Sequence, residues 1–146
     1  MRKASNIKYL TTLFFFVLFS CVNGDSIEKI DYSYSFCDGN SKVWIVNNIL
    51  KGEEVLQTRN ELETPLFVFY ASGKCLMGTL NDFVNSSSQK GDYLLESENE
   101  YVEMNFYGEK WAFIFKFTDE NHLLLRPEKN SKSDLSFELI PFPETN

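Results

Sequence analysis

Few side chains in this chain of 146 residues could carry out acid–base or metal chemistry. His122 is the only histidine, so neither a multi-histidine metal site nor a pair of catalytic imidazoles can be assembled. Serine and aspartate are plentiful enough for a Ser-His-Asp triad, but no Gly-x-Ser-x-Gly elbow accompanies them. His122 stands between TDEN and LLLR, which predicts a turn or the start of a strand at this position.

The carboxylates gather in predicted turns and at strand ends. Paired carboxylates can hydrolyse glycosides when they are held about 5 to 10 Å apart, and calcium takes about six or more oxygen ligands. Neither chemistry has a spaced motif here, so solvated turns explain the carboxylates better. The clusters are Glu53–Glu54, Glu96 with Glu98 and Glu100, and Asp119–Glu120. The sequence therefore predicts a chain that is not an enzyme and that holds no metal and no cofactor.

Cys21 ends the apolar run LFFFVLFSC, which is preceded by the basic residues Arg2, Lys3 and Lys8. A basic start followed by a short uncharged run is typical of a secretion signal. The run is too short for a transmembrane helix, which needs about 20 apolar residues. We therefore predict a signal peptide over residues 1–20.

The four residues Leu18-Phe19-Ser20-Cys21 resemble the lipobox of bacterial lipoproteins. The resemblance implies that Cys21 becomes the mature N-terminus and carries acyl chains such as palmitate, and several chains together anchor a protein firmly. Two alternatives stay open. Ordinary secretion with cleavage after Val22-Asn23-Gly24 would discard Cys21, and the run could instead be kept as a buried N-terminal helix.

Charge excludes one class of partner. After removal of residues 1–20 the chain has 11 basic and 21 acidic residues, a formal charge of −10. Nucleic acid is a poor partner for such a surface because its binding depends on neutralising phosphates. Anionic lipid head groups would also repel it, so acyl chains on Cys21, rather than charge, are expected to hold the protein to a membrane.

Cys37 and Cys75 remain in the mature chain under either cleavage. A disulfide between them can persist outside the cytoplasm and would join the N-terminal arm to the domain. The alternative is two unpaired cysteines that act as small hydrophobic residues, because the sequence does not show whether the two Cα atoms come within about 7 Å.

The chain divides into an arm and one domain. Residues 21–41 are polar and turn-rich, which predicts a flexible tether, although DYSYS at 31–35 alternates like a short edge strand. Residues 42–146 are long enough for one β-rich domain. Within it, KGEEVLQTRNELETP reads as a long polar connection between strands.

The domain repeats short apolar runs broken by turn residues, which predicts an all-β fold. The connections are short, so neighbouring strands are expected to pair as an antiparallel up-and-down meander that closes into a barrel. The eight predicted strands are KVWIVNN, LFVFY, CLMGTL, DYLLES, EYVEMNFY, KWAFIFKF, HLLLR and LSFELIPF.

Aromatic residues alternate along the strand from Trp111 to Phe117, so they share one face. Such a face either packs in a core or lines an apolar pocket. The candidate pocket residues are Trp44, Phe67, Phe69, Trp111, Phe113 and Phe115.

Residues 42 to 142 resemble the lipocalin-like lipoproteins of the Bacteroidetes, which belong to the calycin group. The resemblance rests on the early Trp in KVWIVNN, on LFVFYASGK, on GDYLLESENEYVEMNF, and on FIFKFTDENHLLLR followed by LSFELIPF. It implies a lipocalin-like barrel anchored in the bacterial envelope, in the outer membrane on its periplasmic or surface face. The barrel is expected to bind a small apolar ligand. The alternative is a structural or interaction lipoprotein, an accessory subunit of an envelope or secretion complex, which binds an envelope protein partner.

Overall fold

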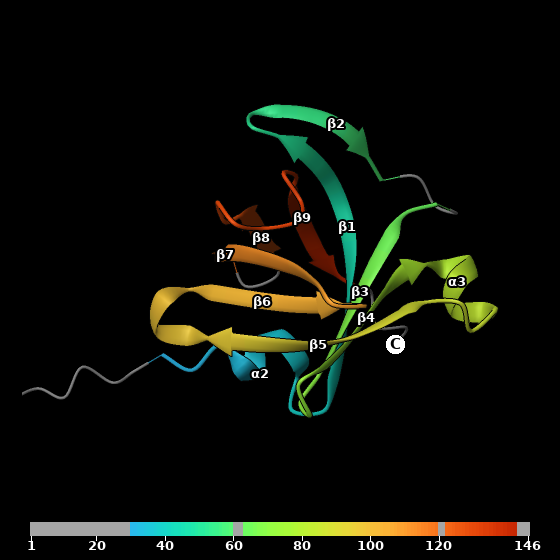
Figure 1. Cartoon of the computed structure of the whole chain (residues 1–146), viewed down its shortest axis with the longest axis horizontal. Coiled ribbons are helices and arrows are strands. Elements are labelled where there is room, and N and C mark those ends of the chain that lie inside the picture. The colour runs from blue at the N-terminus through green and yellow to red at the C-terminus, as the bar shows by residue number, and fades with distance from the viewer. Residues whose placement is uncertain (1–29, 60–62, 120–121, 143–146) are drawn as a thin grey trace, which may run out of the picture.

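The computed structural model describes residues 30–59, 63–119 and 122–142, and these form one antiparallel sheet of nine strands. The sheet curls until β9 pairs with β1, from Trp44 opposite Pro141 to Leu50 opposite Ser136. Eight strands thus close an up-and-down barrel, and one strand, β2, lies outside it (Figure 1). The strands are β1 (Ser41–Lys51), β2 (Glu54–Thr58), β3 (Pro65–Tyr70), β4 (Lys74–Thr79), β5 (Gln89–Glu96), β6 (Tyr101–Phe106), β7 (Glu109–Asp119), β8 (His122–Pro127) and β9 (Ser136–Pro141). The predicted all-β fold and its closure are confirmed.

The strand β1 is long enough to serve two neighbours on one edge. Its first half, Ser41–Ile45, pairs with β3, while Asn48–Lys51 pairs with β2. The predicted polar connection after β1 is therefore partly wrong, because it contains β2. All five residues of β2 are exposed, so no alternation of buried and exposed residues marks this strand in the sequence.

Alternation along β6 and β7 matches the structure, whereas β1 and β3 contain runs of consecutive buried residues. On β6, Val102, Met104 and Phe106 are buried while the residues between them are not. On β7, Phe113 and Phe115 are fully buried, and Ile114 between them is 40% exposed. Successive side chains of a strand point to opposite faces, so one set of side chains fills the barrel and the other set meets solvent.

The tether predicted over residues 21–41 differs from the structure in its described part. Ser33–Cys37 forms a short helix, α2, with Phe36 and Cys37 buried. The alternation at 31–35 therefore marks neither an edge strand nor a plain tether, since a helix begins at Ser33. The alternation of Tyr with Ser was misleading because the side chain that decides the packing is the following Phe36. Residues 1–29, with the predicted signal peptide and the start of the tether, lie outside the described residues.

A second short helix, α3 (Leu80–Val84), follows β4 and begins with a capping box. The Thr79 hydroxyl accepts a bond from the Asp82 backbone N–H, and the Asp82 carboxylate accepts from the Thr79 N–H. The predicted strand through Leu80 is one residue too long, since Thr79 ends β4 and caps the helix. A 3₁₀ turn at Ser97–Asn99 joins β5 to β6.

Two glycines are required by the barrel. Gly108 and Tyr107 both have positive φ, 83° and 53°, in the tight turn between β6 and β7, as in the hairpin turns that match strand twist. Gly91 on β5 lies against β6, and a Cβ there would stand 2.3 Å from the Asn105 carbonyl oxygen. A side chain at position 91 would therefore push the two strands apart.

Candidate functional site at the two ends of the barrel

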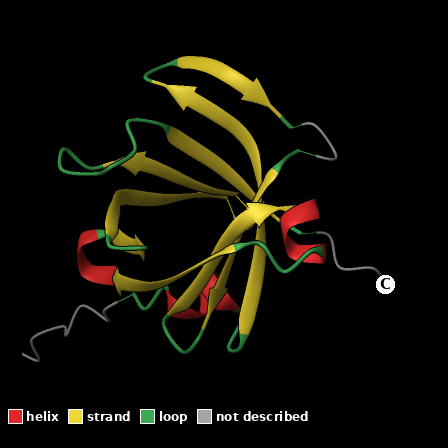
Figure 2. Ribbon diagram, turned by 45° about the vertical axis from the view of Figure 1, so that its right-hand side comes forward, coloured by secondary structure: helices red, strands yellow, loops and turns green. Residues whose placement is uncertain are grey.

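The helix α2 seals one end of the barrel with the ring of Phe36. This ring is fully buried, and its centroid lies 5.3 Å from that of Phe69 and 4.9 Å from that of Phe115, both edge to face. Tyr32 adds a second ring at the same end, 5.2 Å from Phe115. Edge-to-face aromatic pairs stabilise a core beyond the area they bury, and Figure 2 shows α2 lying against the lower ends of the strands.

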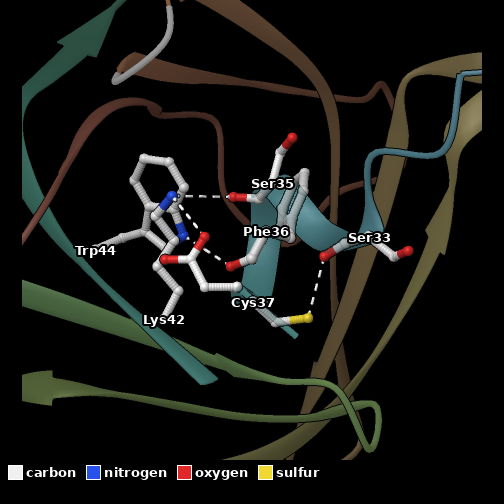
Figure 3. A network of polar contacts seen from close by, with 7 residues as sticks. Ser33, Ser35, Phe36, Cys37, Lys42 and Trp44 are labelled. Atoms are coloured by element: carbon white, nitrogen blue, oxygen red, sulfur yellow. Dashed lines mark hydrogen bonds and ion pairs between the residues drawn. The ribbon is translucent and has the colours of Figure 1, made fainter. Parts of the chain in front are cut away.

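Polar contacts attach α2 to the start of β1. The indole Nε1 of Trp44 donates a buried hydrogen bond of 3.0 Å to the Phe36 carbonyl oxygen. The Lys42 ammonium donates to the Ser35 carbonyl oxygen at 3.3 Å and pairs with Asp38 at 3.4 Å. It also lies 4.6 Å from the centroid of a Trp44 ring, within the range of a cation–π contact. Figure 3 shows Lys42 and Trp44 side by side against the carbonyls of the helix.

The two cysteines predicted as a candidate disulfide are both buried at this end, and both are free thiols in the structure. Cys37 Sγ donates to the Ser33 carbonyl oxygen at 3.0 Å. Burial raises the pKa of the Cys75 thiol to about 12, with Asp92 adding to the rise. The pKa of the Tyr93 hydroxyl also rises to about 12, through burial and then through Cys37 and Cys75. Both thiols therefore lie near the Tyr93 side chain, whose hydroxyl donates to the Tyr70 carbonyl oxygen at 2.9 Å.

The predicted pocket residues lie in one barrel but do not line an open pocket there. Five of them are 0% exposed, and they pack on other aromatic rings or in the core cluster. An internal cavity large enough for water would leave part of their surface accessible. Their role in the structure is core packing, which was the alternative to a pocket. The five are Trp44, Phe67, Phe69, Phe113 and Phe115.

Trp111, the sixth predicted pocket residue, lies toward the opposite end of the barrel and is only partly buried. The apolar side chains of Ile49, Met77 and Leu135 also pack against the core and remain partly exposed. Ile49, Met77 and Trp111 each stand opposite a core residue on a paired strand, so their side chains point to the same inner face. The pairs are Ile49 with Phe137, Met77 with Phe67, and Trp111 with Met104. We call Ile49, Met77, Trp111 and Leu135 the mouth.

Sequence reasoning missed three of the four mouth residues. Ile49 lies just beyond the predicted strand KVWIVNN, Leu135 was counted with the last strand, and Met77 lies in the short predicted strand CLMGTL, two residues after Cys75. For Met77 and Leu135 the signal available was their position, two residues from the buried Cys75 and Phe137. Ile49 has no such signal, because a register shift between Val46 and Asn48 displaces it along β1. Trp111 alone was marked, by its place in the aromatic alternation.

Titratable groups on the outside of the barrel form small ion pairs. Glu103 on β6 accepts from Lys110 at 2.6 Å and from the Tyr101 hydroxyl at 2.7 Å, and these two contacts lower the pKa of its carboxyl group. His122 is exposed at the start of β8, where it lines a surface hollow of about 240 Å³ with Asn47 and Glu138. Glu103 and its partners are therefore a solvent-exposed ion pair, and they do not lie in the same hollow as His122.

Among the described residues, no cluster of three or more His, Cys, Asp or Glu side chains could hold a metal ion. The same part of the chain contains no helix with the length and apolar character needed to cross a membrane. Cys21, the predicted lipidation site, lies outside the described residues. No protein-family model, no curated protein and no solved structure matches this chain.

Proposed function

We propose that this chain is a lipid-anchored, lipocalin-like lipoprotein of the bacterial cell envelope, without catalytic activity, that binds a small apolar molecule at the mouth of its barrel. Acyl chains on Cys21 hold it to a membrane, most simply the outer membrane, with the barrel on the periplasmic or surface side. The closed eight-stranded barrel supports the resemblance to lipocalin-like lipoproteins, because such barrels are just wide enough to admit one small molecule or to be filled by side chains.

The difference between the two ends of the barrel carries this proposal. At the α2 end the ring of Phe36 is fully buried, and the partly exposed rings of Tyr32 and Phe117 stack on each other, with centroids 5.6 Å apart. At the mouth, Ile49, Met77 and Trp111 point inward yet remain partly exposed. Covering apolar surface is favourable by roughly 25 cal/mol for each Å² removed from water. A ligand seated on the mouth would gain this free energy without displacing any core side chain.

A fluorescent apolar probe tests the proposal. N-phenyl-1-naphthylamine is titrated into the soluble chain from Asp25 to Asn146, and its emission rises when it enters an apolar site. We expect saturable binding that Trp111→Ala weakens. Leu94→Ala is the matched control, because Leu94 is 57% exposed and lies on the outer face of β5. Equal affinity in both variants, or no saturable binding, would exclude the mouth as a ligand site.

A second candidate function is an interaction lipoprotein, an accessory subunit that binds an envelope protein. The complete burial of the five predicted pocket residues favours it, since a filled barrel leaves its outer surface to do the binding. The exposed Val55 and Leu56 of β2 offer apolar surface for such a partner. A different protein that copurifies in fixed ratio, with no small molecule, would favour this function over the first.

A further inference from the structure

The strand β2 has a free edge that the rest of the sheet lacks. Within the described residues, each barrel strand pairs on both sides, whereas β2 ends the strand order and pairs with β1 alone. Figure 1 shows it on the outer side of the β1 hairpin, at the top of the molecule. An open strand edge presents unpaired N–H and C=O groups to which another strand can add.

The side chains of β2 are also left to solvent. All five of its residues are exposed, and Val55 and Leu56 are 50% and 51% exposed. Leu56 lies opposite no residue of β1, because the register shifts between Ile49 and Leu50. An apolar pair at the middle of a strand with one unpaired edge is the kind of surface that association would bury.

Charges at the two ends of β2 are complementary to those of a second copy. Glu53 and Glu54 stand at its start, and Arg59 follows its last residue. None of these three side chains makes an ion pair with another described residue. The Arg59 backbone N–H donates to the Asn47 carbonyl oxygen at 2.9 Å, which keeps this residue in line with the strand.

We infer that two copies of this chain associate through their β2 edges, with the two strands antiparallel. In this arrangement the acidic start of each β2 meets Arg59 of the other copy, and the apolar residues meet at the centre. A parallel arrangement would place Glu53 and Glu54 beside their own counterparts, which like-charge repulsion opposes. The dimer joins two barrels by a continuous sheet, and it does not depend on a ligand at the mouth.

Charge exchange tests the inference. The full chain is extracted in a mild non-ionic detergent, and its association is measured by sedimentation velocity over a range of concentrations. We expect the wild-type chain to form a dimer. Arg59→Glu alone, and Glu53→Lys with Glu54→Lys, should each weaken the dimer about tenfold, because each places two sets of like charges opposite one another. The triple variant that combines all three changes restores opposite charges and should restore wild-type association.

Leu56→Lys is a second test at the centre of the interface and should also weaken the dimer, whereas Leu94→Lys, on the outside of β5, should not. Circular dichroism checks that each variant keeps its fold, which we expect because the substituted side chains are exposed. A monomeric wild-type chain would overturn the inference. A dimer that ignores the single reversals, or one that the triple variant fails to restore, would also overturn it.

Discussion

The indole Nε1 of Trp44 lies 3.0 Å from the carbonyl oxygen of Phe36, in a buried hydrogen bond between the first barrel strand and the helix that seals it. This bond joins the N-terminal arm to the barrel at the point where the arm enters it. A buried donor and acceptor are costly to leave unpaired. The pair therefore fixes where the arm ends and the folded domain begins.

Replacing Trp44 by Phe tests this bond. The variant keeps an aromatic ring but leaves the Phe36 carbonyl without its donor, so we expect the free energy of unfolding to fall by about 1 to 3 kcal/mol. Chemical denaturation measures the change. Amide hydrogen exchange should also become faster in α2, whereas Trp111→Phe, at the other end of the barrel, should leave exchange in α2 as it is.

Replacing Phe36 by Ala tests the sealing of the barrel end. The ring is fully buried, and its removal should lower the free energy of unfolding by about 3 to 5 kcal/mol. Tyr34→Ala is the control on the same helix, since Tyr34 is 70% exposed. Equal losses in the two variants would show that the ring of Phe36 is not a core element.

Replacing Gly91 by Ala tests the close approach of β5 and β6. The added Cβ would meet the Asn105 carbonyl oxygen at 2.3 Å, so the strands must separate, and we expect a loss of about 1 to 3 kcal/mol, as in other overpacked sites. Lys90→Ala, at the exposed neighbouring position, should change the thermal midpoint little. A wild-type midpoint in Gly91→Ala would mean that the two strands lie further apart than described.

Alkaline pH should destabilise the protein through Cys75 and Tyr93. Burial raises the pKa of Cys75 from 9.0 to about 12 and that of Tyr93 from 10.0 to about 12. The unfolded chain therefore loses these protons first as pH rises. The loss favours unfolding by roughly 1.4 kcal/mol per pH unit for the buried Cys75 thiol, and by less for the half-buried Tyr93 hydroxyl, which solvent screens. The stabilisation that these two protonated groups contribute is complete below pH 9 and is lost between about pH 9 and 12.

The variant Cys75→Ala separates the two contributions. Its decline in stability should begin one pH unit later, near pH 10, because Tyr93 alone contributes. Denaturation curves recorded from pH 7 to 11 would show this difference, and an identical decline in both proteins would contradict it.

Eight strands could be predicted from the sequence because each has at least one face that is buried or partly buried, and on a strand such as β6 this burial produces alternation. The strand β2 could not, since Val55 and Leu56 belong to a strand with no buried face. The helix α2 is only five residues long, and what holds it is tertiary: Phe36 packs on β3 and β7, far away in the sequence. The periodicity of a local segment does not depend on such long-range contacts and therefore cannot predict them.

The candidate site was predicted only in part for a related physical reason. An aromatic strand face looks the same in a sequence whether it lines a pocket or a core. Here Phe36 of the N-terminal arm packs against Phe69 and Phe115. No pattern within the strands predicts this contact. Trp111 was marked correctly as inward-facing, but its partial exposure depends on where the barrel ends.

Native mass spectrometry of the protein purified from bacterial membranes tests the central claim most directly. The account predicts a chain that begins at Cys21, has the added mass of its acyl chains, and retains a small apolar molecule that Trp111→Ala loses. A chain that begins at Asp25 without added mass would contradict the anchoring. A mature chain that carries no small molecule, but holds a different protein in fixed ratio, would contradict ligand binding at the mouth.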